Sequence, residues 1–354
     1  MSITIRTALV TGAAQGIGKG IALELAKDGY QIAVTDLPHQ REQALQTVKE
    51  IEQLGVKAIF IEADSSNRDQ MFKAVDETYE KLGSFNTMIN NAGIVHVSPL
   101  VEVTEEDIDR INKININGVI WGIQAAAKKF EALDQPGKII NACSIAGLDA
   151  FQMMGIYSAT KFAVRALTQV AAKELAPKKI TVNAYCPGIV LTPMWDIIDA
   201  KMGEYHGVPK GETVKKYIDN IALGRGSVPQ DIANLVSFLG SEKSDYITGQ
   251  SIAVDGGVLT LLEDSFTAIG LELTEKPFKL EFSKAALTKI LLKYFWSKSE
   301  KSISEESLDN SLYLLIATCS NSTASPYKIE DSSLYVLALE NIKWKSSRIS
   351  LRLE

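Results

Sequence analysis

Three side chains near the middle of the chain have types and spacing suited to proton transfer: Ser144, Tyr157 and Lys161. Tyr157 and Lys161 are four residues apart, so on a helix they lie on one face, one turn from each other. A phenol in a model peptide titrates near pH ~10, and a nearby positive charge favours its ionised form. We therefore expect Lys161 to lower the pKa of Tyr157 and to make it a usable acid or base near neutral pH.

The pattern around these residues predicts the elements that would bring them together. Residues 138–143 are mostly apolar and are typical of a buried strand, which ends at Ser144. An apolar pattern from Gly155 onward, closed by Pro177, predicts a helix that carries the phenol and the amine. The strand would deliver one hydroxyl group and the helix would deliver the other.

A glycine-rich turn lies between a short buried strand, residues 7–11, and a predicted helix that ends near Gly29. The glycines of this turn are Gly12, Gly16 and Gly18. In this order the glycines let the backbone approach a pyrophosphate, and the helix N-terminus offers free N–H groups and the positive end of its dipole. The context favours dinucleotide binding over a plain tight turn.

Asp36 ends the second predicted strand, at the position where such folds bind the adenine ribose hydroxyls. Its carboxylate would also repel a 2′-phosphate by about 4 kcal/mol at ~4 Å and an effective dielectric of ~20, which is roughly a thousandfold in affinity. Arg41 is the only nearby arginine that is a candidate to offset this charge. We therefore expect NAD(H) as the cofactor rather than NADP(H). The alternative is that Asp36 serves only as a turn residue before Pro38.

The alternation of strand and helix continues along the chain, with a helix at 41–54 and strands at 56–63 and 86–89. Such regular alternation is typical of a parallel sheet that helices cover on both faces. We predict an α/β fold, a Rossmann-type doubly wound parallel sheet with helices on both faces, over residues 1–258.

Two asparagines stand at turns of this pattern. Asn91 follows a predicted strand, and because ligands of such sheets bind beyond the strand ends, we expect it to border the cofactor rather than to serve a turn alone. Asn115 opens a predicted helix, and the residues leave open whether it caps that helix, faces solvent or has a functional role. Thr104, with Asp107 three residues later, predicts the start of the preceding helix.

Composition and charge exclude several classes of function. The formal net charge is −6, and no basic run is interleaved with aromatic residues, so we predict no nucleic-acid partner. No apolar run approaches the ~18 residues that span a bilayer, and no leader precedes the first strand, so we expect a cytoplasmic protein without a membrane contact. The scattered cysteines and histidines predict no metal site. Their positions are Cys143, Cys186 and Cys319, and His39, His96 and His206.

Taken together, these motifs resemble the classical short-chain dehydrogenase/reductase family. The residues that carry the resemblance are Thr11, Gly12, Gly16 and Gly18, the run Asn90-Asn91-Ala92-Gly93, Asn115, Ser144, Tyr157, Lys161, Pro187-Gly188 and Thr192. The resemblance implies that Ser144 orients the substrate oxygen, that Tyr157 exchanges the proton, and that Lys161 binds the nicotinamide ribose. It also implies that Asn115 holds a water of the proton relay. The implied cofactor-binding set is Gly12, Gln15, Gly16, Ile17, Gly18, Asp36, Asp64, Asn91, Tyr157, Lys161, Pro187, Gly188, Ile189 and Thr192.

More narrowly, several runs are similar to the diacetyl/acetoin reductases, also called 2,3-butanediol dehydrogenases. These runs are 118–124, 138–144, 161–165, 185–190 and 192–195. The similarity implies reversible, NAD(H)-dependent reduction of a small diketone or hydroxyketone in a homo-oligomer, a tetramer or a dimer. Ile145 departs from the polar residue that these relatives often have after the serine. The alternatives are a related reductase of another substrate, such as a sugar alcohol or a 3-oxoacyl compound, and a nucleotide-binding regulatory protein.

The segment 193–223 contains several glycines and prolines, and we expect it to be an irregular, partly mobile lid over the substrate. Met194 and Trp195 in it would either wall a small apolar pocket or serve ordinary packing. Beyond it, the pattern predicts a helix at 229–239 and a last strand at 246–257.

The family pattern ends near Gly257, and residues 259–354 are expected to form a small C-terminal extension of α+β structure and unknown function. Alternation around Pro277 predicts a hairpin, with a helix at 283–296 and strands at 333–342 and 342–353 after it. This helix would carry a second Tyr and Lys at the same spacing, which we interpret as a solvated helix face. They are Tyr294 and Lys298.

Overall fold

The apolar run Thr7–Thr11 forms β1, whose five residues are all buried at the centre of a seven-stranded sheet. All strand pairs in this sheet are parallel, and the order is β3-β2-β1-β4-β5-β6-β7. In this computed structural model, residues 5–261, 279–282 and 350–353 are described. The remaining strands of the sheet are β2 Gln31–Asp36, β3 Ala58–Glu62, β4 Thr87–Asn90, β5 Gly137–Ala142, β6 Ile180–Pro187 and β7 Ser251–Val254.

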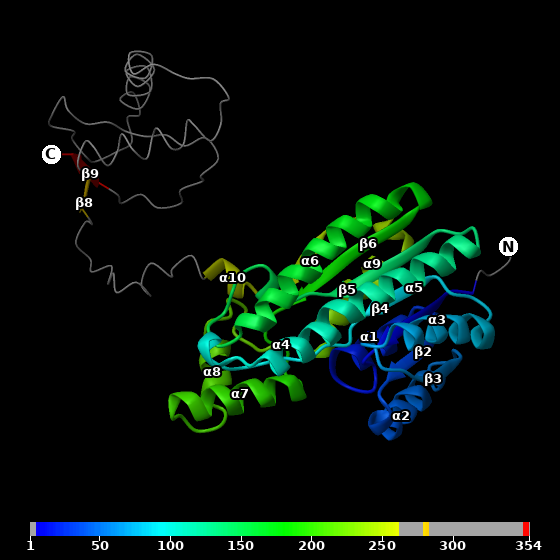
Figure 1. Cartoon of the computed structure of the whole chain (residues 1–354), viewed down its shortest axis with the longest axis horizontal. Helices are drawn as coiled ribbons and strands as arrows, with labels where there is room; N and C mark the ends of the chain where they lie inside the picture. The colour runs from blue at the N-terminus through cyan, green and yellow to red at the C-terminus, as the bar shows by residue number, and fades with distance from the viewer. Residues whose placement is uncertain (1–4, 262–278, 283–349, 354) are drawn as a thin grey trace, which may run out of the picture. The chain divides into compact units, whose positions relative to one another are not determined.

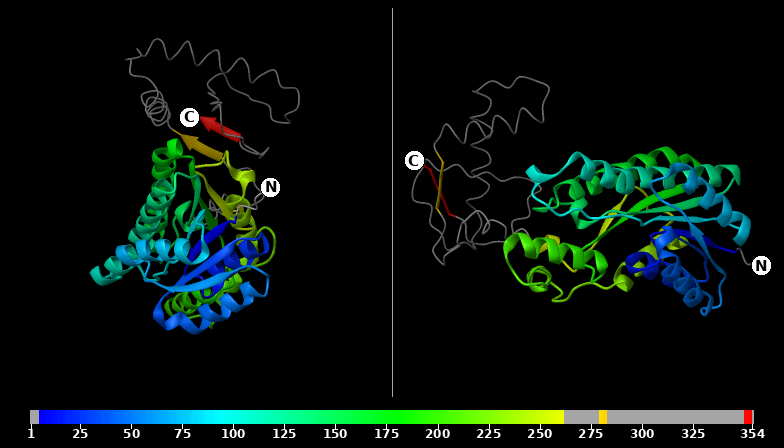
Figure 2. Two further views of the ribbon diagram at one scale, coloured as in Figure 1. Left: turned by 90° about the vertical axis from the view of Figure 1, so that its right-hand side faces the viewer. Right: turned by 60° about the horizontal axis from the view of Figure 1, so that its bottom comes forward.

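Helices cover both faces of the sheet (Figures 1 and 2). Successive strand residues point to opposite faces, and Leu9 and Val10 of β1 accordingly belong to two different core clusters. The Val10 cluster packs under α1 Gly16–Lys27, α2 Arg41–Glu52 and α9 Pro229–Gly240. The Leu9 cluster packs under α3 Arg68–Leu82, α5 Gly118–Ala132 and α6 Gly155–Leu175. The predicted doubly wound α/β fold is therefore confirmed.

Strand order reverses between β1 and β4, where the chain crosses from one half of the sheet to the other. The loops beyond the carboxyl ends of these two strands diverge to opposite faces, which leaves a crevice at this point in doubly wound folds. The glycine-rich turn follows β1 and Asn91 follows β4, so both of these predicted features meet there.

The helices α4 Glu105–Asn112 and α5 are joined without a break by a π-helix, Lys113–Asn117. Thr104 caps α4 in a reciprocal capping box with Asp107, as predicted. The expected helix start near residue 114 is wrong, because the π-helix continues α4 directly into α5. Asn115 therefore lies inside a continuous helical segment and not at its N-terminus.

The predicted irregular segment 193–223 is also wrong, since it contains α7 Pro193–His206 and α8 Glu212–Asp219. Pro193 occupies the first turn of α7, where its missing N–H is not needed. Gly207 has a φ of 66° and ends α7, and Gly211, with a φ of 95°, precedes α8. The glycines mark the ends of helices rather than a loop.

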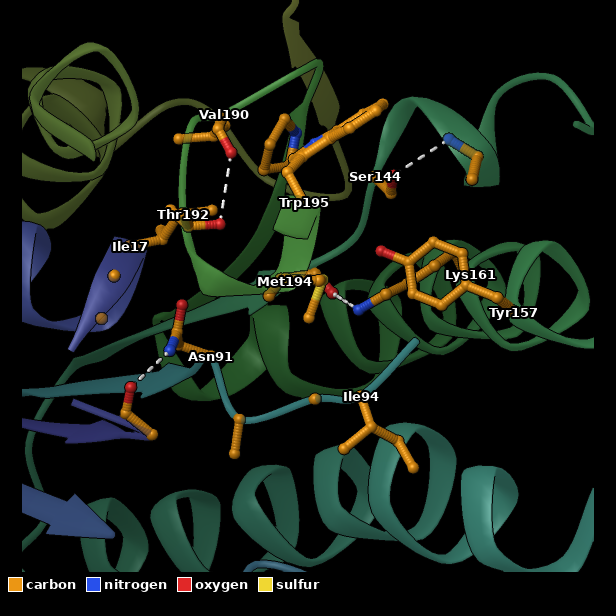
Figure 3. A pocket seen from close by; sticks show the side chains of 18 of the residues that line it. Ile17, Asn91, Ile94, Ser144, Tyr157, Lys161, Val190, Thr192, Met194 and Trp195 are labelled. Carbon is orange, nitrogen blue, oxygen red and sulfur yellow. Dashed lines mark hydrogen bonds between the residues drawn. The ribbon is translucent and has the colours of Figure 1, made fainter. Parts of the chain in front are cut away.

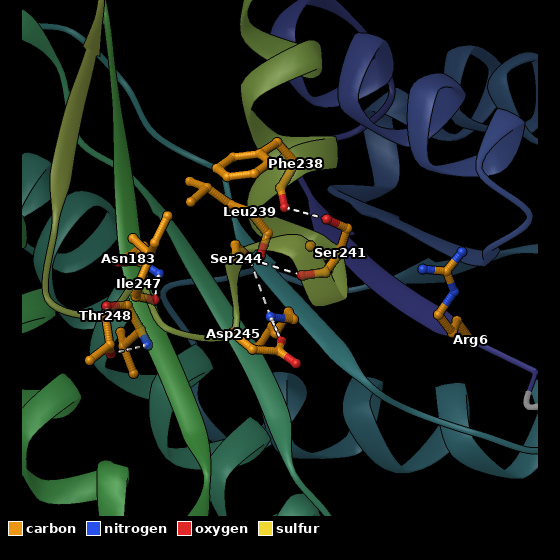
Figure 4. Close-up of polar contacts among 12 residues, drawn as sticks. Arg6, Asn183, Phe238, Leu239, Ser241, Ser244, Asp245, Ile247 and Thr248 are labelled. Atoms are coloured by element: carbon orange, nitrogen blue, oxygen red, sulfur yellow. Dashed lines mark hydrogen bonds and ion pairs between the residues drawn. The ribbon is translucent and has the colours of Figure 1, made fainter.

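The last strand is shorter than predicted, because residues 246–250 run past the edge of β6 and make side-chain contacts with it. The Asn183 amide donates to the carbonyl of Ile247 at 2.7 Å, and the hydroxyl of Thr248 accepts from the backbone of Val182 at 3.0 Å (Figure 4). These bonds replace the regular ladder, which begins at Ser251.

The chain divides into two compact units, Met1–Glu263 and Asp264–Glu354. The first unit ends with α10 Val258–Leu261. In the second, β8 Lys279–Phe282 pairs in parallel with β9 Ser350–Leu353, and both fall within predicted strands. The other predictions for the tail, including the helix with Tyr294 and Lys298, lie outside the described residues. In the described part of the chain, no helix is long and apolar enough to cross a membrane.

Candidate active site

A cavity of about 380 Å³ lies beyond the carboxyl ends of β1, β4, β5 and β6. It runs from the glycine-rich turn at one end to an apolar wall beneath α7 and α8 at the other. Of the predicted site residues, Asn115 alone does not line it. The others that line it are Gly12, Gln15, Gly16, Ile17, Gly18, Asp36, Asp64, Asn91, Ser144, Tyr157, Lys161, Pro187, Gly188, Ile189 and Thr192.

The glycine-rich turn is shaped as a cradle for a phosphate. Gly12 has a φ of 64°, in the left-handed region that glycine adopts without strain. A Cβ atom on Gly18 would lie 2.3 Å from the carbonyl oxygen of Gly12, so only a glycine fits there. The side chain of Gln15 does not cap α1, so the first N–H groups and the positive dipole end of this helix are open to an anion. These residues fit the pyrophosphate of a dinucleotide.

Asp36 faces the cavity from the end of β2. One of its oxygens accepts a hydrogen bond from the N–H of Ala14 at 3.0 Å, and the other accepts from Leu37 at 2.9 Å. Arg41 does not pair with it, because its guanidinium lies 3.6 Å from a carboxylate oxygen of Glu62. The carboxylate of Asp36 therefore faces the cavity without Arg41 as its partner.

Asn91 ties the glycine-rich turn to the end of β4. Its amide nitrogen donates to the carbonyl of Thr11 at 2.9 Å and to the carbonyl of Gly12 at 3.1 Å. On the opposite wall, the segment after β6 approaches the same turn, and the Thr192 methyl group lies 3.7 Å from where a Cβ of Gly16 would be. Two loops thus close around the turn from different strands.

Ser144, Tyr157 and Lys161 meet at the middle of the cavity (Figure 3). Ser144 comes two residues after the end of β5 and caps a short 3₁₀-helix, Ile145–Gly147, while the other two residues share one face of α6. Figure 3 shows the phenol oxygen of Tyr157 turned toward Ser144. The ammonium of Lys161 donates to the carbonyl of Ala142 at 2.8 Å, at the end of β5. Two hydroxyl groups thus converge on one place where a carbonyl oxygen can be bound.

The predicted lowering of the Tyr157 pKa by Lys161 is wrong. Burial raises the pKa of Tyr157 to about 12, and the Ser144 hydroxyl beside it acts only partly in the opposite direction. Burial also lowers the pKa of Lys161, because it disfavours the charged ammonium. The Lys161 nitrogen lies 5.6 Å from the centroid of the Tyr157 ring. In this geometry desolvation outweighs the attraction between the two groups, and the phenol stays protonated at neutral pH.

Asn115 lies behind the wall of the cavity and is 1% exposed. Its side chain accepts from the N–H of Ile94 at 2.9 Å and donates to the carbonyl of the same residue at 2.9 Å. It also donates to the hydroxyl of Thr160 on α6 at 3.1 Å. Asn115 therefore connects the π-helix to the loop after β4 and to α6. It neither caps a helix nor faces solvent, which were two of the three possibilities that the sequence left open.

The far end of the cavity is apolar, and Met194 and Trp195 contribute to its wall. The ring of Trp195 on α7 makes an edge contact with Tyr217 on α8, with 5.6 Å between centroids. The sequence did not single out the other apolar residues, because they come from separate segments and share no spacing. They are Ile94, Ile114, Phe151, Met154, Ile198, Tyr217 and Val258. Ile145 completes this wall.

No cluster of metal ligands accompanies the cavity. The described residues contain no group of three or more histidine, cysteine, aspartate or glutamate side chains placed to bind a metal ion. Cys143 and Cys186 are both free and buried, and Cys319 is outside the described residues.

Comparison with known proteins identifies relatives along the same part of the chain. An L-2,3-butanediol dehydrogenase of Corynebacterium glutamicum is 56% identical over 254 residues, which cover 72% of this chain and 98% of the relative. A diacetyl reductase [(S)-acetoin forming] of Staphylococcus epidermidis is 47% identical over 255 residues, which cover 72% of this chain and 98% of the relative.

Solved structures agree with this result. An acetoin dehydrogenase from Salmonella typhimurium matches with a TM-score of 0.64 and 31% identity, over 73% of this chain and 97% of its own. A short-chain type dehydrogenase/reductase from Mycobacterium marinum matches with a TM-score of 0.65 and 33% identity, over 72% of this chain and 95% of its own. The family model described as short chain dehydrogenase matches residues 6–203. From its glycine-rich turn to its serine, tyrosine and lysine, the chain belongs to the short-chain dehydrogenase/reductase family of oxidoreductases.

Proposed function

We propose that the protein is an NAD(H)-dependent reductase that converts diacetyl to acetoin and acetoin to 2,3-butanediol, reversibly. The observation that carries this proposal is a single cavity with an anion cradle at one end, a serine, tyrosine and lysine in the middle, and a small apolar pocket at the other. The names of the relatives support the choice of substrate. Substrates of this kind have short methyl ends, which suit an apolar wall.

Three polar residues of the cavity, and Asn115 behind its wall, have roles in the proposed reaction. Hydride addition to a carbonyl carbon leaves negative charge on the oxygen, which two hydroxyl donors can stabilise and one can neutralise. Ser144 orients the oxygen, and Tyr157 donates the proton, since its raised pKa keeps it protonated at neutral pH. Lys161 lies one turn further along α6, where it would bind the ribose next to the reacting ring. Asn115 would hold a water of the proton relay through the π-helix.

Bound NADH would supply the hydride, and the residues of this chain would hold its parts in order along the cavity. The cradle of Gly12, Gly16 and Gly18 would bind the pyrophosphate, and Asp36 would accept the ribose hydroxyls. Remaining contacts would come from Gln15, Ile17, Asp64 and Asn91 on one side, and from Pro187, Gly188, Ile189 and Thr192 on the other. The uncompensated charge of Asp36 supports NAD over NADP.

The proposed catalytic domain is residues 1–258, and residues 259–354 are a separate extension. The proposed assembly is a homo-oligomer, a tetramer or a dimer, in the cytoplasm where the cofactor is recycled. Phe162 and Val170 on α6 are 41% and 51% exposed and would suit burial against another copy. Light scattering from the purified chain measures the assembly, and a monomeric mass would contradict it.

Replacing the phenol tests the reaction itself. We expect Tyr157→Phe to reduce kcat for acetoin with NADH by about 10²- to 10⁴-fold, the usual contribution of a positioned acid, with little change in the dissociation constant of NADH. Tyr205→Phe, in an exposed position, is the matched control and should keep full activity. Equal activity in the Tyr157 variant would refute the assigned role.

A substrate panel separates the proposal from its alternatives. Purified protein is assayed for NADH oxidation with diacetyl, acetoin, xylulose and an acetoacetyl ester. Diacetyl and acetoin should give the highest kcat/KM. A higher value for the sugar or the ester would reassign the substrate, and NADH binding without turnover of any compound would favour a regulatory protein.

A further inference from the structure

Tyr185 is a buried tyrosine that the sequence pattern marks only as part of an apolar strand. It lies in β6, is 0% exposed, and faces the cavity beside the predicted site residues. Its hydroxyl donates to the side-chain oxygen of Asn91 at 2.8 Å. Ala142, opposite it in the neighbouring strand β5, has only a methyl group, which leaves space for the ring to reach Asn91.

This contact fixes the orientation of the Asn91 amide. An amide group has one acceptor oxygen and one donor nitrogen, and the two ends exchange if it turns over. The carbonyls of Thr11 and Gly12 can only accept, so the nitrogen faces them, and the hydrogen bond from Tyr185 holds the oxygen on the opposite side. Burial raises the pKa of Tyr185, so the phenol remains a donor over the whole working range of pH.

The orientation matters because the amide nitrogen occupies the space inside the glycine-rich turn. It lies 3.2 Å from the position of a Cβ on Gly12 and 2.5 Å from that of a Cβ on Gly18. A turned amide would set its oxygen against two carbonyl oxygens and push the turn outward. The glycine-rich turn follows β1. Its shape therefore depends on the hydrogen bond that Tyr185, in β6, makes to Asn91.

We propose that Tyr185 is a positioning residue for the dinucleotide, which holds the glycine-rich turn in its binding shape through Asn91. The proposal rests on the proposed function only in taking NADH as the ligand of this turn. It predicts a loss in cofactor affinity and none in the chemical step, since neither Tyr185 nor Asn91 bonds to the reacting groups.

A second buried tyrosine provides a matched control. Tyr30 is 1% exposed and its hydroxyl donates to the carbonyl of Gly240 at 2.6 Å, at the start of β2 and the end of α9. Removing either hydroxyl leaves one acceptor without this donor, and in Tyr30→Phe it also removes the acceptor of the Arg6 guanidinium at 3.4 Å, so the control is expected to cost at least as much stability. Only Tyr185 is connected to the glycine-rich turn.

The experiment measures NADH binding directly by fluorescence titration, for Tyr185→Phe and Tyr30→Phe, each purified with NADH to stabilise the folded state. We expect the dissociation constant of NADH to rise on the order of tenfold in Tyr185→Phe and less than about twofold in Tyr30→Phe, with kcat at saturating NADH unchanged in both. An unchanged dissociation constant in Tyr185→Phe would overturn the proposal. So would a Tyr185→Phe chain that fails to fold where Tyr30→Phe folds, since its hydroxyl would then support the whole domain.

A double-variant cycle tests the route through Asn91. Asn91→Leu should weaken NADH binding, and adding Tyr185→Phe to it should weaken binding no further. Additive losses would show that Tyr185 acts by another route and would also overturn the proposal. NADH binding is measured without substrate, so these outcomes do not depend on the proposed acetoin reaction. A failure of that reaction would be seen in the substrate panel instead.

Discussion

Tyr157 and Lys161 share a helix face, and their burial moves both groups toward the uncharged form. A phenol in that state is ready to give a proton to a carbonyl oxygen, which is the direction of ketone reduction. In the reverse direction the same oxygen must first lose its proton, so a positive charge beside it is needed to favour the phenolate. At neutral pH the phenol is therefore in the protonation state that the reductive step requires.

At the other end of the cavity, the carboxylate of Asp36 is expected to determine the preference for NADH over NADPH. Asp36→Asn should raise the ratio of kcat/KM for NADPH to that for NADH by roughly ten- to a hundredfold. This is less than the roughly thousandfold of the bare charge estimate, because the group is partly open to solvent. Steady-state kinetics with both cofactors measure the ratio.

Asp64→Asn is the control for this change, since Asp64 also lines the cavity and its oxygen accepts from Ser66. It should weaken both cofactors alike and leave the ratio unchanged. A ratio that stays constant in Asp36→Asn would contradict the role assigned to this carboxylate.

Among the elements, those predicted correctly are the ones whose signals are local. The strand, glycine turn and helix at the N-terminus follow directly from residue order, and the strand ending at Ser144 from its apolar run. The helices α7 and α8 were missed because glycines that end helices look the same in sequence as glycines in loops. The shifted pKa of Tyr157 was missed because its burial depends on residues distant in the chain, such as Ile111, Ile198 and Met202.

The helices α7 and α8 are held together by a buried carboxylate. Asp199 on α7 is 3% exposed, and its two oxygens accept from the N–H groups of Gly211 and Val214 at 2.6 and 2.9 Å, at the start of α8. Both helices contribute to the apolar wall through Trp195 and Tyr217. The spacing of that wall therefore depends on a cap supplied by the neighbouring helix.

Removing this cap is expected to loosen the substrate end of the cavity. Asp199→Ala should raise KM for acetoin several-fold, with less than about a twofold change in the dissociation constant of NADH, because the cofactor end contains neither helix. Asp219→Ala, at the exposed end of α8, should change neither value. Equal losses for acetoin and NADH in Asp199→Ala would mean that the carboxylate supports the domain as a whole.

For the whole molecule, the relatives define how much chain the site requires. Almost the whole length of each relative aligns with 72% of this chain. Every predicted site residue lies in the first unit, Met1–Glu263. All the strands and helices that line the cavity are also in that unit. The extension adds no described residue to the site.

Truncation after residue 263 is therefore expected to leave kcat/KM for acetoin within about threefold of the full chain, because the sheet and its covering helices are complete without the second unit. The measurement is a steady-state assay of both chains, with light scattering to compare their assemblies. Loss of all activity in the shorter chain would show that the extension is needed, and a change of mass alone would assign it to assembly.

The π-helix between α4 and α5 makes the site sensitive to chain length as well as to residue type. A π-turn contains one more residue than an α-turn, so deleting any one residue from Lys113–Asn117 would let a regular α-helix run through. The wide turn absorbs that extra residue, so the helices on either side keep their phase. The deletion would instead displace Asn115, whose side chain bonds to Ile94 and Thr160 from inside this turn. Variation in this segment is therefore expected to keep the residue count as well as the asparagine.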